Sequence, residues 1–562
     1  NCPSSVPNCS GTIGDASGTN GTRPKLSRKG VIKMINKSLW IADSNPTNYP
    51  ALTNDETADV CIVGGGIVAA VTAYLLAKNN VSVIVLEKDR ICMGVTANST
   101  AKLTSQHGLF YKYLENEYGL EFAKKYLESN EEGIKLAEKI INDENIDCNF
   151  EKKDAYVFAP NESELNKIKD EVETVNKIGF NAEFVQNVNI PVEKVLGAIK
   201  FPNQAQFNSR KYTVELFDRS VKLGVKIFEN SKVEKIEHNL DSYSVNANGF
   251  NVLAKKVLIA SHYPIKNFPG MYFSKMYQDK SYAIAVDTKT DNNNDKIIDG
   301  MFIQSCTPAI SFRTAKYNEK ELLVVAGAGH KTGESQGNIE DSFNNLENYI
   351  KKYYPNAEVK FKWSTEDCVT LDKIPYIGRF SNLLPNIYVA TGFKKWGMST
   401  SHVAGKLISD LILGNKNEYV EIYKATRLNP IKNIKEFGNM LKESSYSLVI
   451  NKVKNNDSNF SDIEIGNGGI VEVNGEKVGV YKREDGKVFA VKPYCKHLGC
   501  LVSWNNLEKT WDCPCHGSRY DYMGNIITEP TVKDLDVFKT QGDGGNGLQQ
   551  PKGDRKRLIK MV

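Results

Sequence analysis

The spacing of apolar residues between positions 58 and 87 predicts a strand, a helix and a second strand. This stretch reads ADVCIVGGGIVAAVTAYLLAKNNVSVIVLE, in which two short apolar runs flank a glycine turn and a segment with apolar side chains at helical spacing. Gly64 would permit the tight turn, Gly66 would let the backbone approach a pyrophosphate, and Ala69 is small enough for close helix packing. Glu87 ends the second run, where it would accept hydrogen bonds from a ribose. An ordinary buried turn would not require that acid, so the pattern predicts a dinucleotide-binding unit.

Further changes in the spacing of apolar residues divide the chain into a large α/β part and a small all-β part. One sheet that binds the dinucleotide is predicted from alternating strands and helices near residues 58–110, 212–262 and 386–414. The segments between them predict a mostly antiparallel β-sheet on the substrate side, decorated by helices over residues 119–144 and 162–179. A small β-sandwich is predicted from strands separated by Gly and Asn-Gly turns at residues 468–475, 476–483 and 486–493.

Composition supplies the remaining boundaries. The start of the chain is rich in Gly, Ser, Asn and Thr and its end is rich in Gly and polar residues, so we expect a disordered or non-native leader and a disordered tail. A polar stretch that includes NNDSN is typical of a linker between two folded parts. The expected order is a leader at 1–33, a two-part α/β domain at 34–414, a linker at 415–457, an all-β domain at 458–541 and a tail at 542–562.

Net charge and hydropathy argue against two classes of partner. The chain has 72 basic and 67 acidic residues without a concentrated basic stripe, so we do not expect it to bind nucleic acid. No apolar run approaches the ~20 residues needed to span a bilayer. We therefore expect no transmembrane segment and a cytoplasmic location.

Two short motifs near the C-terminus each combine a cysteine with a histidine. Cys495 and His497 belong to the first motif, and Cys513 and His516 belong to the second. Two thiolates could hold one iron of a 2Fe-2S cluster and two imidazoles the other, which is the Rieske ligand pattern and raises the reduction potential above that of an all-cysteine cluster. A structural zinc site could use the same four residues. Zinc explains neither the two additional cysteines nor the Gly-Ser-x-Tyr sequence that follows.

Residues 494–522 resemble the high-potential Rieske proteins of cytochrome bc-type quinol oxidoreductases. In those proteins the cysteines that do not bind iron form a disulfide between the cluster loops, so the resemblance implies a disulfide between Cys500 and Cys515. The family also has a serine hydroxyl that donates to a bridging sulfide and a tyrosine hydroxyl that donates to a ligand cysteine, which match Ser518 and Tyr520 here. Both hydrogen bonds would stabilise the added electron and raise the potential. Dioxygenase-type Rieske sites lack this cysteine pair.

The stretch from Leu86 to Gly108, LEKDRICMGVTANSTAKLTSQHG, resembles the D-amino-acid-oxidase-like FAD-dependent oxidoreductases. Residues 225–236 match a strand whose backbone contacts adenine in that family, near Val233. Residues 257–264 match the strand that closes the nucleotide-binding sheet, although Ser261 and His262 stand where the family has Thr-Gly. The resemblance covers most of residues 38–540 and implies that the dinucleotide is FAD rather than NAD.

A third segment, residues 386–414, resembles the part of the family that faces the flavin. We expect a strand to end at Gly392 and a helix to begin near Ser399 or Thr400, so that the unpaired N–H groups and the positive end of the helix dipole face the preceding turn. The resemblance implies that the flavin pyrimidine lies there, beside Trp396 and the backbone donors of Gly397, Met398 and Ser399. The alternative for the Trp396 and Met398 side chains is a place in the core.

The sequence names few catalytic residues, because flavin-dependent amine dehydrogenation often needs no protein base. Arg313 could bind a substrate carboxylate, and its alternative is a surface or structural ion pair. Lys102 could lie near the flavin, and its alternative is a solvated or phosphate-side lysine. In amino-acid-oxidase relatives an arginine commonly lies shortly before the motif that matches Asp367 and residues 374–378, but residues 361–378 contain no arginine. This difference argues against a simple α-amino-acid substrate.

Together these patterns predict a FAD-dependent oxidoreductase that carries a Rieske 2Fe-2S cluster. We expect it to dehydrogenate a small amine or amino-acid-like substrate and to pass electrons from FAD through the cluster to a one-electron acceptor, either a protein carrier or a quinone. The alternative is a redox sensor or electron-transfer module that has no dedicated small-molecule substrate.

Overall fold

The computed structural model describes eight stretches of the chain, which are residues 37–266, 268–289, 297–307, 309–333, 339–427, 460–473, 475–531 and 533–538. Residues 35–562 cluster into one compact unit. The leader expected at 1–33, the tail expected at 542–562 and most of the expected linker lie outside the described residues.

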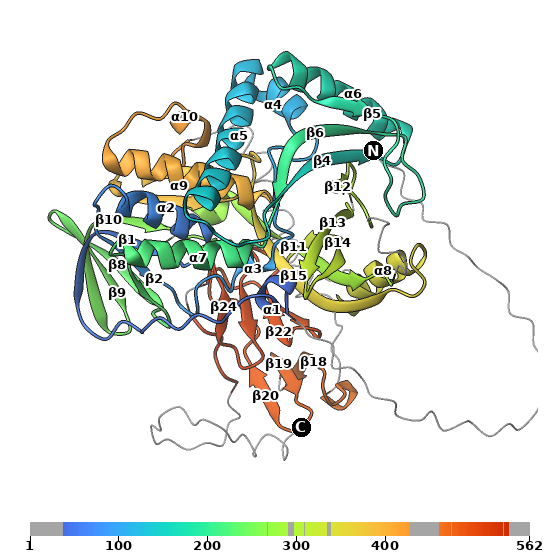
Figure 1. Cartoon of the computed structure of the whole chain (residues 1–562). Helices are drawn as coiled ribbons and strands as arrows, with labels where there is room; N and C mark the ends of the chain where they lie inside the picture. Colours follow the sequence, from blue (N-terminus) through green and yellow to red (C-terminus); the bar gives the residue numbers. More distant parts are fainter. Residues whose placement is uncertain are drawn as a thin grey trace, which may run out of the picture. The chain divides into compact units, whose positions relative to one another are not determined.

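The predicted dinucleotide-binding unit forms as a strand, a helix and a parallel strand. These elements are β1 (Glu56–Val63), α2 (Ile67–Ala77) and β2 (Val83–Leu86). They belong to a sheet with the strand order β16-β17-β10-β1-β2-β7. Figure 1 labels β1, β2 and β10 of this sheet. The other strands are β7 (Lys226–Phe228), β10 (Phe250–Ile259), β16 (Tyr376–Ser381) and β17 (Leu384–Thr391), and only β16 runs antiparallel to its neighbour on this path. The carboxyl ends of β1, β2, β10 and β17 therefore meet at one edge, which is where such sheets bind their ligands.

Helices cover one face of this sheet and share one hydrophobic core. Helix α2 packs against α7 (Ser209–Lys222) and α9 (Gly397–Leu413), and α9 packs against α5 (Leu120–Asp143). Ten of the 11 residues of α2 are buried, because this helix is apolar on every side rather than along one stripe. A Cβ at Gly405 of α9 would lie 2.4 Å from a methyl carbon of Val71, so glycine allows α2 and α9 to approach closely.

Helix α9 begins at Gly397, two residues before the predicted start. Trp396 is its N-cap residue, and the N–H of Thr400 already reaches the carbonyl of Trp396 at 3.4 Å. Ser399 and Thr400 lie inside the first turn, so neither side chain is the N-cap. The prediction placed the helix start near Ser399 or Thr400, and the cap at Trp396 makes no side-chain hydrogen bond that the sequence could have indicated.

The second sheet is mostly antiparallel, as predicted, with one parallel pair. Its order is β15-β11-β14-β13-β12-β4-β6-β3, with β5 beside β6, and β12 runs parallel to β4 (Figure 1). The bounds are β3 (Lys102–Leu103), β4 (Glu151–Ala159), β5 (Glu183–Val185), β6 (Gly197–Gln206), β11 (Met276–Asp287), β12 (Met301–Gln304), β13 (Ser311–Tyr317), β14 (Lys320–Lys331) and β15 (Glu358–Thr370). Helix α6 (Glu162–Lys177) packs on β4 and β6, and α8 (Ile339–Lys351) packs on β11 and β14.

The segment predicted as one strand at residues 225–236 is divided in two. Strand β7 ends at Phe228, and β8 (Val233–Asn239) begins a hairpin with β9 (Ser242–Ala247). Between them, Asn230 has a φ of +49°, a left-handed conformation that ends a strand. Short helical elements complete this part of the fold: α1 (Leu39–Ala42), α3 (Val95–Asn98), α4 (Tyr111–Tyr118), η1 (Tyr272–Ser274) and α10 (Val420–Tyr423).

Residues after Gly414, which we predicted as linker, still pack on the α/β part as far as Arg427. The hydroxyl of Tyr423 hydrogen bonds to Ser129 Oγ at 2.7 Å, and Tyr423 belongs to the main hydrophobic core. Arg427 pairs with Asp372 at 2.7 Å and stacks over the ring of Tyr376. The sequence did not indicate these contacts, because the segment is polar overall and only a few aromatic residues and one arginine make them.

The C-terminal part contains two small antiparallel sheets. All three predicted strands appear, as β18 (Gly468–Val473), β19 (Glu476–Lys482) and β20 (Val488–Val491), and the helical turn η2 (Phe460–Asp462) precedes them. The second sheet is formed by β21 (Ser503–Asn505), β22 (Thr510–Asp512), β23 (Arg519–Asp521) and β24 (Ile526–Thr528). In the part of the chain that the structure describes, no helix combines the length and apolarity needed to cross a membrane.

Candidate cofactor and substrate sites

The glycine turn after β1 forms the floor of a cavity of about 440 Å³. Gly64 has a φ of +104°, and a Cβ there would lie 2.6 Å from the carbonyl oxygen of Ala260. A Cβ at Gly65 would lie 2.6 Å from a methyl carbon of Ile91. Side chains at either position would therefore collide with the wall, while Gly66 leaves the start of α2 open toward the cavity. Ala69 is buried inside α2 and does not line the cavity, as its packing role requires.

Glu87 and Val233 lie on the wall of the same cavity, although they come from different parts of the sequence. Glu87 follows β2, and its carboxylate accepts hydrogen bonds from the N–H groups of Gly65 at 2.7 Å and Asp89 at 3.0 Å. Burial raises the pKa of Glu87, and these two backbone donors oppose that shift. A carboxylate held at the end of β2 and beside the glycine turn can accept a hydrogen bond from a ribose.

The start of α9 also lines the cavity. Gly397 and Met398 line it, and their position in the first turn leaves their N–H groups without partners inside the helix. Trp396 lies on the neighbouring cavity, where its ring stacks on His107 with centroids 4.9 Å apart. Ser399 is buried and lines neither cavity, and its hydroxyl lies 3.1 Å from Nε2 of His107. The structure thus brings Gly397 and Met398 to the cavity and places Ser399 behind them.

Several buried polar atoms on the cavity wall suit a polar ligand. Ser401 Oγ, Thr365 Oγ1 and His262 Nε2 are buried and have no hydrogen-bond partner among the described residues, and all three residues line the cavity. Buried polar groups are almost always hydrogen bonded, so these atoms indicate a ligand with donors and acceptors of its own. Together with the glycine turn and the α9 N-terminus, they fit FAD along the length of the cavity.

A second and larger cavity of about 950 Å³ lies against the second sheet, beside β11, β13 and β14. It shares part of its wall with the first cavity, because His262, Thr365, Phe393, Gly397 and Met398 line both. A molecule in the second cavity can therefore contact the end of a dinucleotide that lies near α9. This arrangement is suitable for a substrate cavity.

Lys102 lines the second cavity, whereas Arg313 lines neither. The Lys102 ammonium donates to the carbonyl of Phe302 at 3.0 Å, and burial, followed by the nearby charge of Arg313, lowers the pKa of Lys102 to about 7. The Arg313 guanidinium is buried and donates to the carbonyls of Ala101 at 2.6 Å and Thr100 at 3.1 Å. Arg313 therefore braces the loop before Lys102 through carbonyl groups rather than through an ion pair.

Sequence reasoning missed other charged residues of the second cavity. Asp279 and Lys395 form an ion pair at 2.6 Å, and burial raises the pKa of Asp367 to about 6. Burial also lowers the pKa of Lys394 to about 7, and the Lys394 ammonium lies 4.2 Å from the ring centre of Phe110. The sequence signals were the motif that matches Asp367 and the pair of lysines directly before Trp396, in the segment that resembles the flavin-facing part of the family. The cavity thus offers one carboxylate, Asp367, and two ammonium groups, Lys102 and Lys394, whose charge changes near neutral pH.

The predicted cluster ligands lie on two loops of similar geometry. The N–H of Gly499 donates to the carbonyl of Cys495 at 2.9 Å, and the N–H of Gly517 donates to that of Cys513 at 3.0 Å. Both glycines have a positive φ, of +78° and +77°, which an L side chain rarely adopts. Each loop therefore closes into a turn between its cysteine and its glycine, and the histidine lies within that turn.

The two histidines of these loops face one another. The ring centres of His497 and His516 are 4.9 Å apart and the rings are nearly perpendicular. Nδ1 of His497 is buried and has no hydrogen-bond partner among the described residues, as expected for a nitrogen that binds a metal. Burial lowers the pKa of His516 to about 4 and also lowers that of His497, so both imidazoles are neutral, which metal ligation requires. The donor set fits a 2Fe-2S cluster.

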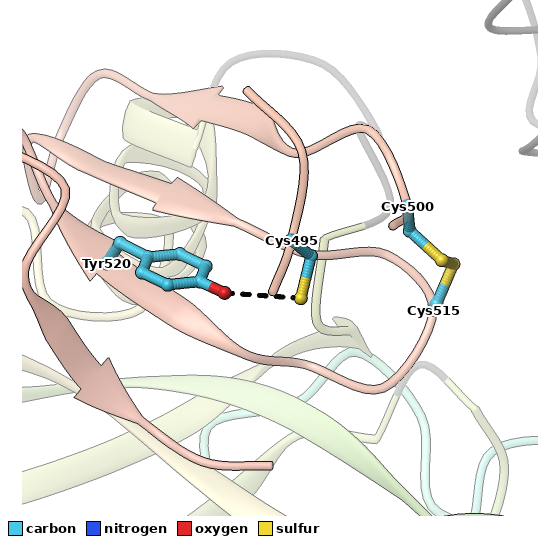
Figure 2. The surroundings of a disulfide bond; sticks show 4 residues. All are labelled: Cys495, Cys500, Cys515 and Tyr520. Carbon is cyan, nitrogen blue, oxygen red and sulfur yellow. Dashed lines mark hydrogen bonds between the residues drawn. A yellow bond between two sulfur atoms is a disulfide. The ribbon is translucent and has the colours of Figure 1, made fainter. Parts of the chain in front are cut away.

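The structure shows what surrounds the residues that the Rieske resemblance singled out beside the ligands. Cys500 and Cys515 form a disulfide (Figure 2). Sγ of Cys513 lies within 4.8 Å of both of its sulfurs. The Tyr520 hydroxyl donates to Sγ of Cys495 at 3.3 Å (Figure 2). Ser518 is fully buried, and its Oγ accepts a hydrogen bond from the N–H of Thr531 at 3.2 Å.

An aromatic residue of the α/β part contacts the two histidines. The ring centre of Phe273, in η1, lies 5.2 Å from that of His497 and 6.2 Å from that of His516, and both ring pairs are edge to face. No sequence signal pointed to Phe273. The histidine face of the cluster site therefore lies against the part of the chain that contains the dinucleotide cavity.

Comparison with known proteins agrees with both sites. Residues 59–411 match the family of FAD dependent oxidoreductases, and residues 457–539 match the Rieske [2Fe-2S] domain. The Rieske 2Fe-2S iron-sulfur protein YhfW of Bacillus subtilis (strain 168) is 33% identical over 499 residues, which cover 89% of this chain and 97% of YhfW.

Two further proteins match about two thirds of this chain. Gamma-glutamylputrescine oxidoreductase of Escherichia coli (strain K12) is 22% identical over 393 residues, which cover 68% of this chain and 90% of the relative. The crystal structure of glycine oxidase from Geobacillus kaustophilus aligns with a TM-score of 0.55 at 19% identity, covering 66% of this chain and 99% of that one. This structural likeness confirms the fold of the α/β part. The chain therefore belongs to the family of FAD dependent oxidoreductases, and it carries a C-terminal Rieske domain with a 2Fe-2S cluster.

Proposed function

We propose that this enzyme dehydrogenates a small amine or amino-acid-like substrate and that the electrons pass from FAD through the Rieske cluster to a one-electron acceptor, a protein carrier or a quinone. The observation that carries the proposal is the wall shared by the two cavities, which includes His262, Phe393 and Met398. When bound, FAD supplies two-electron oxidation of a C–H bond, and a 2Fe-2S cluster carries one electron at a time.

Residues of the two sites have the following proposed roles. The glycine turn, Glu87 and Val233 would hold the adenosine and pyrophosphate end of FAD, and the first turn of α9 at Gly397 and Met398 would donate to the flavin. The cluster ligands would be Cys495, His497, Cys513 and His516, with Ser518 and Tyr520 as donors to sulfur.

Charged groups of the second cavity support a substrate with an amino group. Asp279 and Asp367 can bind an ammonium group, and the raised pKa of Asp367, about 6, lets it release or accept a proton near neutral pH. Lys102 and Lys394 can bind a carboxylate when protonated. Arg313, whose guanidinium is directed to backbone carbonyls, is proposed to position the Lys102 loop and not to bind substrate. The amine named by the E. coli relative and the amino acid named by the glycine oxidase support the same substrate class.

The enzyme reading is favoured over a redox sensor by the size of the second cavity and by its lining. A cavity of about 950 Å³ that is lined by both carboxylates and ammonium groups can hold a small substrate. The cytoplasmic location stays a prediction.

An anaerobic titration tests this proposal. A panel of amines and amino acids is added to the oxidised protein, and flavin absorption and the cluster signal in electron paramagnetic resonance are followed together. We expect a true substrate to bleach the flavin and then to reduce the cluster. A flavin that bleaches while the cluster stays oxidised would contradict the relay, and a flavin that no amine bleaches would contradict the substrate class.

A variant without the cluster serves as the matched control. In Cys495→Ser the substrate should still bleach the flavin, while the reduction of an added one-electron acceptor should fall to background. Acceptor reduction at the wild-type rate in this variant would show that electrons leave from the flavin directly.

A further inference from the structure

The wall of the FAD cavity includes residues of the C-terminal Rieske domain. Arg519, Ile527, Thr528 and Glu529 line it together with residues of the α/β part. The family of FAD dependent oxidoreductases matches residues 59–411 and thus does not include these positions. Their presence on the wall is a property of this chain, in which the two domains are joined.

A buried group of charges connects the two domains beside this wall. We call it the docking network, and it consists of Lys280 on β11, Glu366 on β15, Glu508 in the turn after β21, Asp512 on β22 and Arg519 on β23. Arg519 pairs with Asp512 at 3.0 Å, with Glu366 at 3.1 Å and with Glu508. Lys280 pairs with Glu508 and, at 3.5 Å, with Glu366.

The docking network is sensitive to the loss of either cation. It contains two cations and three carboxylates, and the side chain of Lys280 is only 1% exposed. Burial opposes the ionisation of Glu508, but Arg519 and Lys280 lower its pKa to about 2. Removal of one partner from a buried ion pair leaves an uncompensated charge, which is strongly destabilising. Arg519 and Glu366 are at once members of the network and parts of the cavity wall.

Backbone carbonyls of the Rieske domain complete the attachment. Gln278 Nε2 donates to the carbonyl of Glu529 at 2.8 Å and, at 3.3 Å, to that of His516. Lys88 Nζ donates to the carbonyl of Ile527 at 2.7 Å. Residues 527–529 are thus held against the cavity by side chains of the α/β part.

Two glycines allow the close approach at the cluster loop. A Cβ at Gly517 would lie 2.7 Å from Cβ of Gln278, and a Cβ at Gly333 would lie 2.5 Å from Cα of Pro514. Gly333 lines neither cavity, so it offers a way to disturb the contact between the domains without changing the FAD cavity directly.

We propose that the Rieske domain forms part of the FAD-binding site, so that retention of FAD depends on docking of this domain through the Arg519 network. The proposal concerns cofactor binding alone and does not depend on the substrate or on the direction of electron flow.

The first test is the variant Arg519→Gln in the full-length protein. The protein is diluted, and the dissociation constant of FAD is measured from the recovery of the fluorescence of free flavin, while the cluster is followed by its visible absorption. We expect the dissociation constant to rise about tenfold or more with the cluster retained. Arg483→Gln is the matched control, because Arg483 pairs with Asp485 within its own domain and lines neither cavity. It should bind FAD as the wild type does.

The second test uses Gly333→Ala and keeps the proposal falsifiable if Arg519→Gln does not fold. Gly333 and Gly249 share a φ of +82°, but a Cβ at Gly249 would meet no atom within 4 Å. Gly249→Ala therefore carries the same backbone strain without the clash against Pro514. We expect Gly333→Ala to weaken FAD binding severalfold more than Gly249→Ala. Wild-type FAD binding in both Arg519→Gln and Gly333→Ala would overturn the proposal, whatever their turnover.

Discussion

The two cofactor sites of this chain differ in how the sequence encodes them. All four proposed cluster ligands lie between Cys495 and His516, on two loops that close by the same turn onto Gly499 and Gly517. The FAD cavity is assembled from segments that begin at Val63 and end at Glu529, and the Rieske domain supplies part of it. One site is thus nearly complete within a short stretch of chain, and the other exists only when distant segments have packed.

This difference determines what each site should tolerate. The cluster site depends on a few atoms that bind metal, so a single ligand change removes it and leaves the other site in place. The FAD cavity depends on close approach of backbone segments, so small steric changes should weaken it while the cluster persists. The predictions below test this separation from both sides.

The largest expected effect is the loss of the cluster in ligand variants. Cys495→Ser, His497→Ala, Cys513→Ser or His516→Ala removes a metal bond, so the 2Fe-2S absorption should disappear while FAD remains bound. Cys306→Ser is the control, because Cys306 is a free cysteine outside the cluster loops. A cluster that survives any of the four ligand changes would show that the ligands were assigned wrongly, and loss of FAD in these variants would show that docking of the Rieske domain requires the cluster.

The converse change is Gly64→Ala in the glycine turn. The new Cβ would lie 2.6 Å from the Ala260 carbonyl at a φ of +104°, so we expect FAD affinity to fall at least about tenfold while the cluster spectrum is retained. Gly224→Ala is a matched control, since Gly224 has a φ of +95° and open space around it. Flavin and cluster absorption of the purified proteins measure both outcomes. Equal FAD content in the two variants would contradict the steric role of Gly64.

Local patterns predicted the parts of the molecule that local interactions determine. The strand, turn and helix from β1 to α2, the long helices α5 and α6 and the strands β18 to β20 all appear where apolar period and turn residues placed them. The cluster loops were predictable for a related reason. Four metal-binding side chains at short spacing have few alternative uses, whereas a single lysine or aspartate has many.

Contacts between distant segments were not predictable. Lys280, Glu366 and Arg519 are ordinary charged residues in the sequence, and only the fold brings them together. Arg313 was predicted either to bind substrate or to form an ion pair, because its place on a substrate-side strand was visible but the direction of its guanidinium was not. The start of α9 at Gly397 was not predictable either, because the Trp396 cap is defined by backbone geometry and not by a capping side chain.

A smaller effect is expected at Lys102, on the substrate side of the FAD site. Its pKa of about 7 lies below its ordinary value of 10.5, so between these values the unfolded chain holds a proton that the native state lacks. Stability from this group therefore rises with pH from about 7 to 10.5, and below pH 7 the native state bears the full cost of a buried charge. Lys102→Met should raise the melting temperature at pH 6 by about 2 °C, and the gain should shrink toward pH 10.

Melting curves across this pH range measure the effect, with Lys139→Met as the control, because the Lys139 side chain is 69% exposed. A gain that does not depend on pH would contradict a buried, titrating Lys102. If Lys102→Met is stabilised in this way and also loses turnover with an otherwise good substrate, the lysine is retained for function and not for stability.

The smallest expected effect separates tuning of the cluster from its ligation. Tyr520→Phe deletes the hydroxyl that donates to Sγ of Cys495 at 3.3 Å, and no metal bond is lost, so the cluster should remain (Figure 2). A hydrogen bond to a charged group contributes about 1.5–3 kcal/mol, which corresponds to roughly 65–130 mV for one electron. The midpoint potential from a redox titration should fall by this amount, because the donor stabilises the reduced and more negative cluster.

Tyr522→Phe is the matched control, since Tyr522 packs against Phe489 and Tyr481 and should leave the potential unchanged. Equal potentials in Tyr520→Phe and the wild type would mean that the hydroxyl does not act on the cluster, and the high-potential resemblance, with its implication of a quinone or similar acceptor, would then lose its support.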